Sequence, residues 1–265
     1  MAPPSDPAWL RNVFGDGAVT SVDLSRSKAT DVDLERLKGM EQLNYLSLGE
    51  THITDAGIEH LQGLRQLKTL SLSSTRITDA GLEQLQGLRQ LHDLNLSETQ
   101  ITGVGFQHLK ELSQLEEIDL SRTQITDASL EYLKGLNQLH EIRLVETQIT
   151  GVGFKHLKGL SQLHNLDVSG TQITAAGWKQ LEGLKQLQSL YLNCTPITDV
   201  GLEHLNGLKQ LYVLFLVATD ITDAGLEKLQ NLAQLKTICL TKTKVTDAGV
   251  EKLKKSLPNL QIQSW

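Results

Sequence analysis

The sequence has few aromatic residues and no long apolar run, and each shortage excludes a class of protein. Aromatic residues make up only 4% of the 265 residues, so leucine, isoleucine and valine must build the core. No apolar run approaches the roughly 18 residues that a membrane-spanning helix needs. The first residues also lack the basic and apolar regions of a signal peptide. We therefore expect a protein that neither crosses nor binds a membrane.

Cysteine is equally scarce. It occurs only as Cys194 and Cys239, which lie at positions of the repeat described below that are not equivalent. We predict that these two residues do not form a disulfide. Unpaired thiols are typical of a reducing compartment, which predicts a cytoplasmic location.

Charge and motifs exclude further classes of protein. The formal net charge is -6 at pH 7, and no cluster of Lys and Arg offers the phosphate contacts that nucleic-acid binding needs. The sequence contains no P-loop and no G-x-G-x-x-G, H-E-x-x-H, C-x-x-C or G-x-S-x-G motif. Acidic residues are abundant, but paired carboxylates act in catalysis only within a cleft. We predict a protein that is not an enzyme, holds no cofactor and binds no nucleic acid.

What the sequence does have is a repeat of 24 residues. It follows L-x-x-L-x-L-x-x-T-x-I-T-D-A-G-L-E-x-L-x-G-L-x-Q and is almost complete from Leu67 to Gln90. The alternation of Leu70 and Leu72 predicts a short strand, and the later apolar spacing predicts a return segment with a helical turn. Ten coils follow one another when a first coil is counted at Val19. The other nine open at Leu43, Leu67, Leu91, Leu115, Leu139, Leu163, Leu187, Leu211 and Leu235.

From about Val19 to Trp265 this pattern resembles the leucine-rich-repeat family, whose signature L-x-x-L-x-L-x-x-N/C-x-L it matches except for Thr at the Asn or Cys position. The coils look like those of bacterial leucine-rich-repeat proteins. The I-T-D-x-G-L core is also similar to the longer, Cys-containing repeats of F-box substrate receptors. The resemblance implies an α/β solenoid shaped like a horseshoe, with a parallel β-sheet on the concave face and short helices on the convex face. It implies a recognition scaffold and leaves the ligand open.

The repeat defines one continuous solenoid domain. We predict an N-terminal capping segment at residues 1–18, where Trp9, Leu10, Val13 and Phe14 form one helical stripe. Ten repeats occupy residues 19–259, and residues 260–265 form a C-terminal cap. Such caps shield the open ends of a stack of coils.

Two columns of the repeat carry structural expectations. A threonine column should form a buried hydroxyl ladder that satisfies backbone groups of the turns, with Ser27 keeping the hydroxyl in the first coil. The Thr-Asp pair that follows should cap each helix. Because Gly103, Gly151 and Ala175 replace this Asp, we expect those three helices to be weaker or irregular. The threonine column comprises Thr51, Thr75, Thr99, Thr123, Thr147, Thr171, Thr195, Thr219 and Thr243.

The middle coils place an acidic zone on the concave face. Its acidic side chains are countered only by Arg122 and Arg143, so the zone would attract a partner with a basic surface, or would simply keep the sheet soluble. His92, His140 and His164 share one column with Glu116, which makes a surface metal site or a pH-sensitive patch conceivable. The acidic residues are Asp93, Glu98, Glu116, Glu117, Asp119, Glu141, Glu146 and Asp167.

The later coils place apolar residues on a face where polar ones are the rule. Exposed aromatic side chains cost solubility, and they are the residues that dominate interface hot spots. We therefore predict that Tyr191, Tyr212 and Phe215 anchor a partner that the acidic zone orients. Alternatively, the C-terminal cap or a second copy of the chain covers them. The predicted apolar zone comprises Tyr191, Tyr212, Val213, Phe215, Val217, Ala218 and Cys239.

The sequence thus favours a non-catalytic scaffold that binds a protein or peptide on its concave face. One alternative is a structural or self-associating solenoid, in which the expected monomer would dimerise through the apolar zone. Another is a substrate-recognition subunit similar to F-box proteins. The residues predicted to contact a partner are Glu117, Asp119, Glu141, Arg143, Asp167, Tyr191, Tyr212, Val213, Phe215 and Val217.

Overall fold

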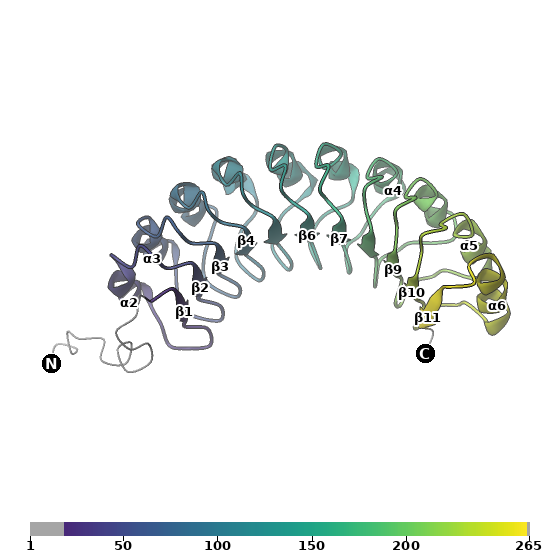
Figure 1. The fold of residues 1–265 in the computed structure, drawn as a ribbon, viewed down its shortest axis with the longest axis horizontal. Coiled ribbons are helices and arrows are strands. Elements are labelled where there is room, and N and C mark those ends of the chain that lie inside the picture. Colours follow the sequence, from purple (N-terminus) through teal and green to yellow (C-terminus); the bar gives the residue numbers. More distant parts are fainter. Residues whose placement is uncertain (1–18, 264–265) are drawn as a thin grey trace.

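The computed structural model describes residues 19–263, which form a single arc with one sheet of eleven parallel strands along its inner side (Figure 1). The strands follow one another in sequence order. The predicted horseshoe with a concave parallel sheet is confirmed. The strands are β1 (Ser21–Asp23), β2 (Tyr45–Ser47), β3 (Thr69–Ser71), β4 (Asp93–Asn95), β5 (Glu117–Asp119), β6 (Glu141–Arg143), β7 (Asn165–Asp167), β8 (Ser189–Tyr191), β9 (Val213–Phe215), β10 (Thr237–Cys239) and β11 (Gln261–Gln263).

Short helices cover the outer, convex side of the arc (Figure 1). Coils near both ends contain α-helical turns, whereas most of the middle coils return through a tighter 3₁₀ helix. The α-helices are α2 (Asp31–Leu34), α3 (Asp55–Ile58), α4 (Ala175–Leu181), α5 (Asp223–Lys228) and α6 (Asp247–Ser256). The 3₁₀ helices are η1 (Glu35–Leu37), η2 (Glu59–Leu61), η3 (Gly81–Gly87), η4 (Val104–Glu111), η5 (Asp127–Leu133), η6 (Val152–His156) and η7 (Gly201–Leu205).

The core runs without interruption between sheet and helices. In strands β1 to β10 the middle residue is a buried aliphatic side chain, such as Leu46 and Leu70, which are register partners. The strand residues on either side of it therefore point toward the concave surface. On the convex side, Phe106, Phe154 and Trp178 fill positions that hold an aliphatic residue in the other coils. No single coil buries its leucines alone, so the stack is the unit of stability.

The three helices expected to be weaker or irregular are not uniformly short. Helix η4, which follows Gly103, has eight residues, and α4, which begins at Ala175, has seven, whereas η3, which follows Asp79, and η5, which begins at Asp127, have seven each. Only η6, after Gly151, is shorter, with five residues. Sequence reasoning assigned each Asp to its own helix, but these carboxylates reach the next coil.

Asp79 shows this arrangement clearly. The backbone N–H groups of Gly103 and Gly105 donate to its carboxylate at 2.9 and 3.0 Å, and the Thr102 hydroxyl donates to it at 2.6 Å. Gly103 itself has a φ of 94°, in the left-handed region that favours glycine. The following coil is therefore capped from outside, and it keeps its helix without an Asp of its own.

Of the two predicted capping segments, only the C-terminal one lies mostly within the described residues. The segment predicted as a C-terminal cap, residues 260–265, contains β11, which pairs in parallel with β10 and extends the sheet. The predicted N-terminal cap, with Trp9, Leu10, Val13 and Phe14, lies outside the described residues. Across residues 19–263, no helix combines the length and the apolar character needed to cross a bilayer.

Candidate binding surface

Parallel pairing arranges the concave side chains in columns that run across the strands. The third residues of β5 to β9 are successive register partners: Asp119, Arg143, Asp167, Tyr191 and Phe215. The first residues of β4 to β9 form a second column: Asp93, Glu117, Glu141, Asn165, Ser189 and Val213. The structure thus places nearly all the predicted contact residues on one continuous surface, with the acidic zone directly beside the apolar zone.

Within the acidic zone, Arg143 lies among the strand carboxylates. Its guanidinium forms an ion pair with Glu141, and the Asn165 side-chain amide donates to the same carboxylate at 3.2 Å. Asp167 accepts a hydrogen bond from the Ser169 backbone N–H at 2.9 Å. Arg143 therefore already has a partner, although four other carboxylates of the two columns surround it.

Those carboxylates are partly withdrawn from water. Burial raises the pKa of Asp93, and Glu141 and Asp119 raise it further against the opposing effect of Arg143. Burial is also the main cause of the raised pKa of Glu117, followed by the charges of Glu141 and Asp93. Like charges on neighbouring strands thus add to the desolvation of this column.

Asp167 lies at the border with the apolar zone, and its pKa is raised as well. Burial is the main cause and outweighs the hydrogen bonds from Ser169 and the charge of Arg143. Its register partner on the next strand is Tyr191. An acidic and an aromatic side chain therefore meet at the junction of the two zones.

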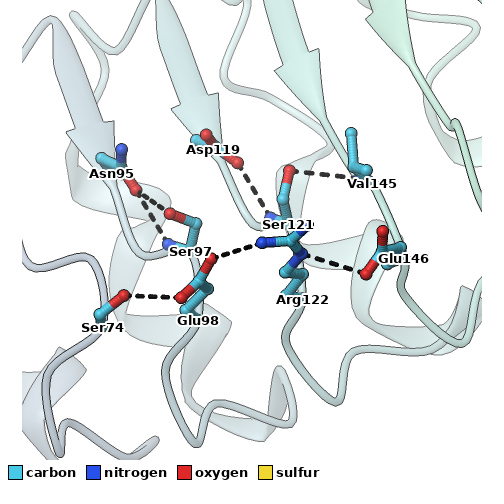
Figure 2. Close-up of polar contacts among 9 residues, drawn as sticks. All are labelled: Ser74, Asn95, Ser97, Glu98, Asp119, Ser121, Arg122, Val145 and Glu146. Carbon is cyan, nitrogen blue, oxygen red and sulfur yellow. Dashed lines mark hydrogen bonds and ion pairs between the residues drawn. The ribbon is translucent and has the colours of Figure 1, made fainter.

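Three of the predicted acidic-zone residues form a separate ladder along the rim (Figure 2). Arg122 donates to Glu98 at 2.8 Å and to Glu146 at 3.0 Å, and the Ser74 hydroxyl donates to Glu98 at 2.8 Å. All four residues have a positive φ between 53° and 57°, at the turn where each coil leaves its strand. Glu98 and Glu146 are paired with Arg122, so the attraction for a basic partner rests on the strand carboxylates.

Sequence reasoning missed this rim ladder, although a signal was present. Positions 24 residues apart carry the alternating charges of Glu98, Arg122 and Glu146, and stacked coils bring such positions together. Farther along the chain the same column continues as Gly170, Cys194 and Ala218, which carry no charge. The charged rim is therefore interrupted along the apolar zone and resumes at Lys242.

The histidine column is only partly brought together. Glu116 lies between two histidines, with oxygen-to-nitrogen distances of 3.4 Å to His140 and 4.0 Å to His92. Among the described residues His164 forms no ion pair, and no group of three His, Cys, Asp or Glu side chains is arranged to hold a metal ion. The arrangement is that of partly exposed polar contacts between side chains.

The apolar zone is centred on Tyr191 and Phe215, whose ring centroids lie 5.0 Å apart with planes tilted by 36°. Tyr212, immediately before β9, is 51% exposed. Tyr191 and Phe215 are half-buried, as are Val213 and Val217. A packed aromatic pair on the same strands as an exposed tyrosine is the kind of surface that contributes strongly to protein interfaces.

The prediction that Cys239 belongs to the exposed apolar zone is wrong. Cys239 is only 5% exposed, and its Sγ lies 3.5 Å from the Thr241 hydroxyl. Near the end of the sheet, the third residue of the strand is half-buried in β9 but buried in β10. Cys194, in contrast, is exposed on the rim, and both cysteines are free, as predicted.

The threonine column is confirmed as a structural feature. Each hydroxyl donates to the backbone carbonyl three residues earlier, as Thr123 does to Leu120 at 2.6 Å. Ser27 differs, because it is exposed and its hydroxyl instead accepts from the Ala29 N–H. The column fixes the turns behind the concave surface and carries no chemistry of its own.

The family profile of the leucine rich repeat matches residues 18–77, 65–125 and 161–221, more than half of the sequence. The chain belongs to the leucine-rich-repeat family. Proteins of the leucine-rich-repeat family generally act in protein binding. The sequence matches none of the curated proteins significantly.

Solved structures of leucine-rich-repeat proteins share the fold. An internalin from Listeria monocytogenes superposes with a TM-score of 0.64 at 24% identity, covering 90% of this chain and 72% of the internalin. Internalin C2 from the same species gives 0.59 at 29% identity, covering 82% of this chain and 84% of that one. A plant peptide hormone receptor in complex with RGF2 gives 0.57 at 17% identity, covering 93% of this chain but 47% of the receptor.

Proposed function

We propose that this protein is a non-catalytic scaffold that binds a protein or peptide on its concave face. The observation that carries the proposal is the apolar zone, in which Tyr191, Tyr212 and Phe215 are gathered on a rigid sheet. Aromatic side chains presented together by a fixed backbone lose little conformational freedom on binding. The fold is suited to such a role, since the plant receptor of similar fold was solved with RGF2 bound.

The electrostatics of the concave face narrow the class of partner. The strand carboxylates from Asp93 to Asp167 would repel nucleic-acid phosphates and anionic lipids, and they would attract a basic protein surface. The carboxylates also lie on an open sheet, whereas paired carboxylates act in catalysis within a cleft, which argues against catalysis. A cytoplasmic location and a bacterial origin stay predictions.

Self-association is the second candidate, because the same apolar zone could pair with that of another copy. The exposed Tyr212 would then be buried at a symmetric interface. Sedimentation of the wild type over a wide concentration range separates the two functions. A stable monomer supports partner binding, whereas a concentration-dependent dimer that Tyr212→Ala abolishes supports self-association.

The test of the proposed function compares partner capture by three forms of the protein. The wild type is immobilised beside a triple variant, Tyr191→Ala with Tyr212→Ala and Phe215→Ala, and beside Tyr45→Ala. Tyr45 is a matched control, because it is 37% exposed on the same concave sheet at the far end. We expect one partner to be retained by the wild type and by Tyr45→Ala and lost by the triple variant. Equal retention by all three forms contradicts the proposal.

A further inference from the structure

The concave face holds an unbalanced pair of carboxylates at a fixed distance from the apolar zone. Asp93 and Glu117 are register partners on β4 and β5, and both side chains are half-buried. Within residues 19–263 neither forms an ion pair, and the guanidinium of Arg143, which pairs with Glu141, acts on both only from a distance. Two carboxylates held side by side on adjacent strands repel each other. A cation placed between them would relieve both the repulsion and the lost hydration.

The distance from this pair to the aromatic pair follows from the sheet. The aromatic rings of Tyr191 and Phe215 belong to β8 and β9, four strands along from β4 and β5. Neighbouring strands lie about 4.8 Å apart, so the two sites are separated by about 19 Å. An extended chain advances about 3.3 Å per residue, so about six residues span this distance.

The width of the surface favours an extended partner segment. Each strand has only three residues, which gives a strip about 10 Å wide across the sheet. The rim ladder of Glu98, Arg122 and Glu146 borders this strip (Figure 2). A helix is about 10 to 12 Å in diameter with its side chains, so it would press against that border. An extended segment is narrower and fits on the strip without displacing the ladder.

From charge complementarity and this spacing, we propose that the partner contributes an extended segment with a Lys or Arg side chain between Asp93 and Glu117 and an apolar side chain, about six residues away, on the Tyr191–Phe215 pair. The proposal rests on the proposed function and specifies its ligand. Asp167, between the two sites and beside Tyr191, accepts a second basic group or a backbone N–H of the segment. The apolar contact supplies most of the affinity, and the carboxylates set the direction in which the segment lies.

The test begins with an unbiased selection. A display library of random 16-residue peptides is selected against the wild type, and survivors are counter-screened against the triple aromatic variant. We expect enriched peptides to carry a basic residue five to seven positions from an aromatic or large aliphatic residue. Enrichment of no peptide contradicts the proposed function and this inference together. Enrichment of peptides that need the aromatic residues but lack the basic residue leaves the proposed function standing and overturns this inference.

Defined peptides then measure the spacing and the charge. The probes are synthetic peptides with one Arg and one Phe separated by glycine-serine spacers of two to fourteen residues. Affinity should peak near a separation of six and fall about tenfold when Asp93→Asn and Glu117→Gln are combined. The matched control Glu131→Gln, an exposed carboxylate in η5 on the convex side, should leave affinity unchanged. A peak near twelve or thirteen, the helical spacing, or no loss in the amide variant would overturn the proposal.

Discussion

A single hydroxyl per coil fixes the turn that follows each strand. Thr123 is 4% exposed, and its hydroxyl donates to the backbone carbonyl of Leu120. This carbonyl takes part in no helical hydrogen bond. Asn or Cys at the equivalent position characterises the leucine-rich-repeat signature. Threonine performs a similar task here with one donor, and its methyl group packs with the aliphatic core.

Removing that donor should therefore cost stability while leaving the shape intact. We expect Thr123→Val to lower the free energy of unfolding by about 1 to 2 kcal/mol, because a buried carbonyl loses its donor. Thr123→Ser keeps the hydroxyl and should cost less. Urea denaturation of the three proteins checks the order. Equal stability of the valine and serine variants would show that the hydrogen bond contributes nothing.

The rim column is conformationally costly, since nine non-glycine residues there have a φ between 53° and 58°. Ala218 has a φ of 54°, whereas Gly170 occupies the same column without a side-chain penalty. We expect Ala218→Gly to raise the free energy of unfolding by about 1 kcal/mol. The control is Ala224→Gly in α5, which should lower it by about 0.5 kcal/mol. Thermal denaturation of both variants measures the two signs, and a loss in each would refute the argument.

The carboxylates of the concave face should also oppose folding. Because burial raises the pKa of Glu117 above that of the unfolded chain, ionisation destabilises the native state as pH rises through the folded pKa. Glu117→Gln should raise the free energy of unfolding at pH 7 by about 0.5 kcal/mol or less, after allowance for solvent screening. The gain should disappear near pH 3. Denaturant titrations at the two pH values test this, and a destabilised variant at pH 7 would contradict it.

At the scale of elements, an Asp-Thr contact joins many successive coils. The carboxylate of Asp55 accepts from the Thr78 hydroxyl at 2.6 Å, and Asp127 does the same with Thr150. Each contact links the start of one convex helix to the start of the next. The remaining pairs are Asp31 with Thr54, Asp79 with Thr102, Asp199 with Thr222 and Asp223 with Thr246.

Asp79 and Asp247 occupy the same repeat position and should respond differently to substitution. Asp79→Ala removes four hydrogen bonds to the next coil and should cost about 2 kcal/mol. Asp247, in the last helix, caps no following coil among the described residues, so Asp247→Ala should cost about 0.5 kcal/mol through the helix dipole. Urea denaturation measures both. Equal losses would mean that the Asp acts on its own helix.

The pH dependence of Asp79 follows from the same contacts. Burial alone would raise its pKa, but the hydrogen bonds from Thr102, Gly105 and Gly103 together hold it below the ordinary value. A lowered folded pKa means that the stabilisation is present above the unfolded value near 3.8 and is lost as pH falls through the folded pKa. The difference between wild type and Asp79→Ala should therefore shrink at acidic pH.

The sequence predicted the whole molecule better than its details. A leucine period of 24 residues fixes the stacking, because coils that repeat identically can bury their apolar faces only against one another. It could not predict contacts between coils, such as Asp79 with Gly103, because these depend on which side chain reaches across the stack. It also placed Cys239 on the open face, since repeat position alone does not reveal how the last strands are covered. The first and third residues of each strand could be assigned to the concave side from the sequence because side-chain direction alternates along a strand.

The arc presents one face that can be read as a single surface, acidic in its middle and apolar toward the C-terminal coils. Rigid-body binding is expected for such a sheet, since every strand between the ends is paired on both sides. The convex surface carries many charged and polar residues, together with exposed valines such as Val104 and with Tyr132. The proposed binding function therefore depends on whether a partner covers the concave or the convex face.

Hydroxyl-radical footprinting with a captured partner decides this most directly. Tyr212, 51% exposed on the concave face, and Tyr132, 41% exposed on the convex face, are comparable reporters within one chain. We predict that the partner suppresses labelling of Tyr212 and leaves Tyr132 unchanged. Suppressed labelling of Tyr132 with Tyr212 still reactive would contradict binding on the concave face.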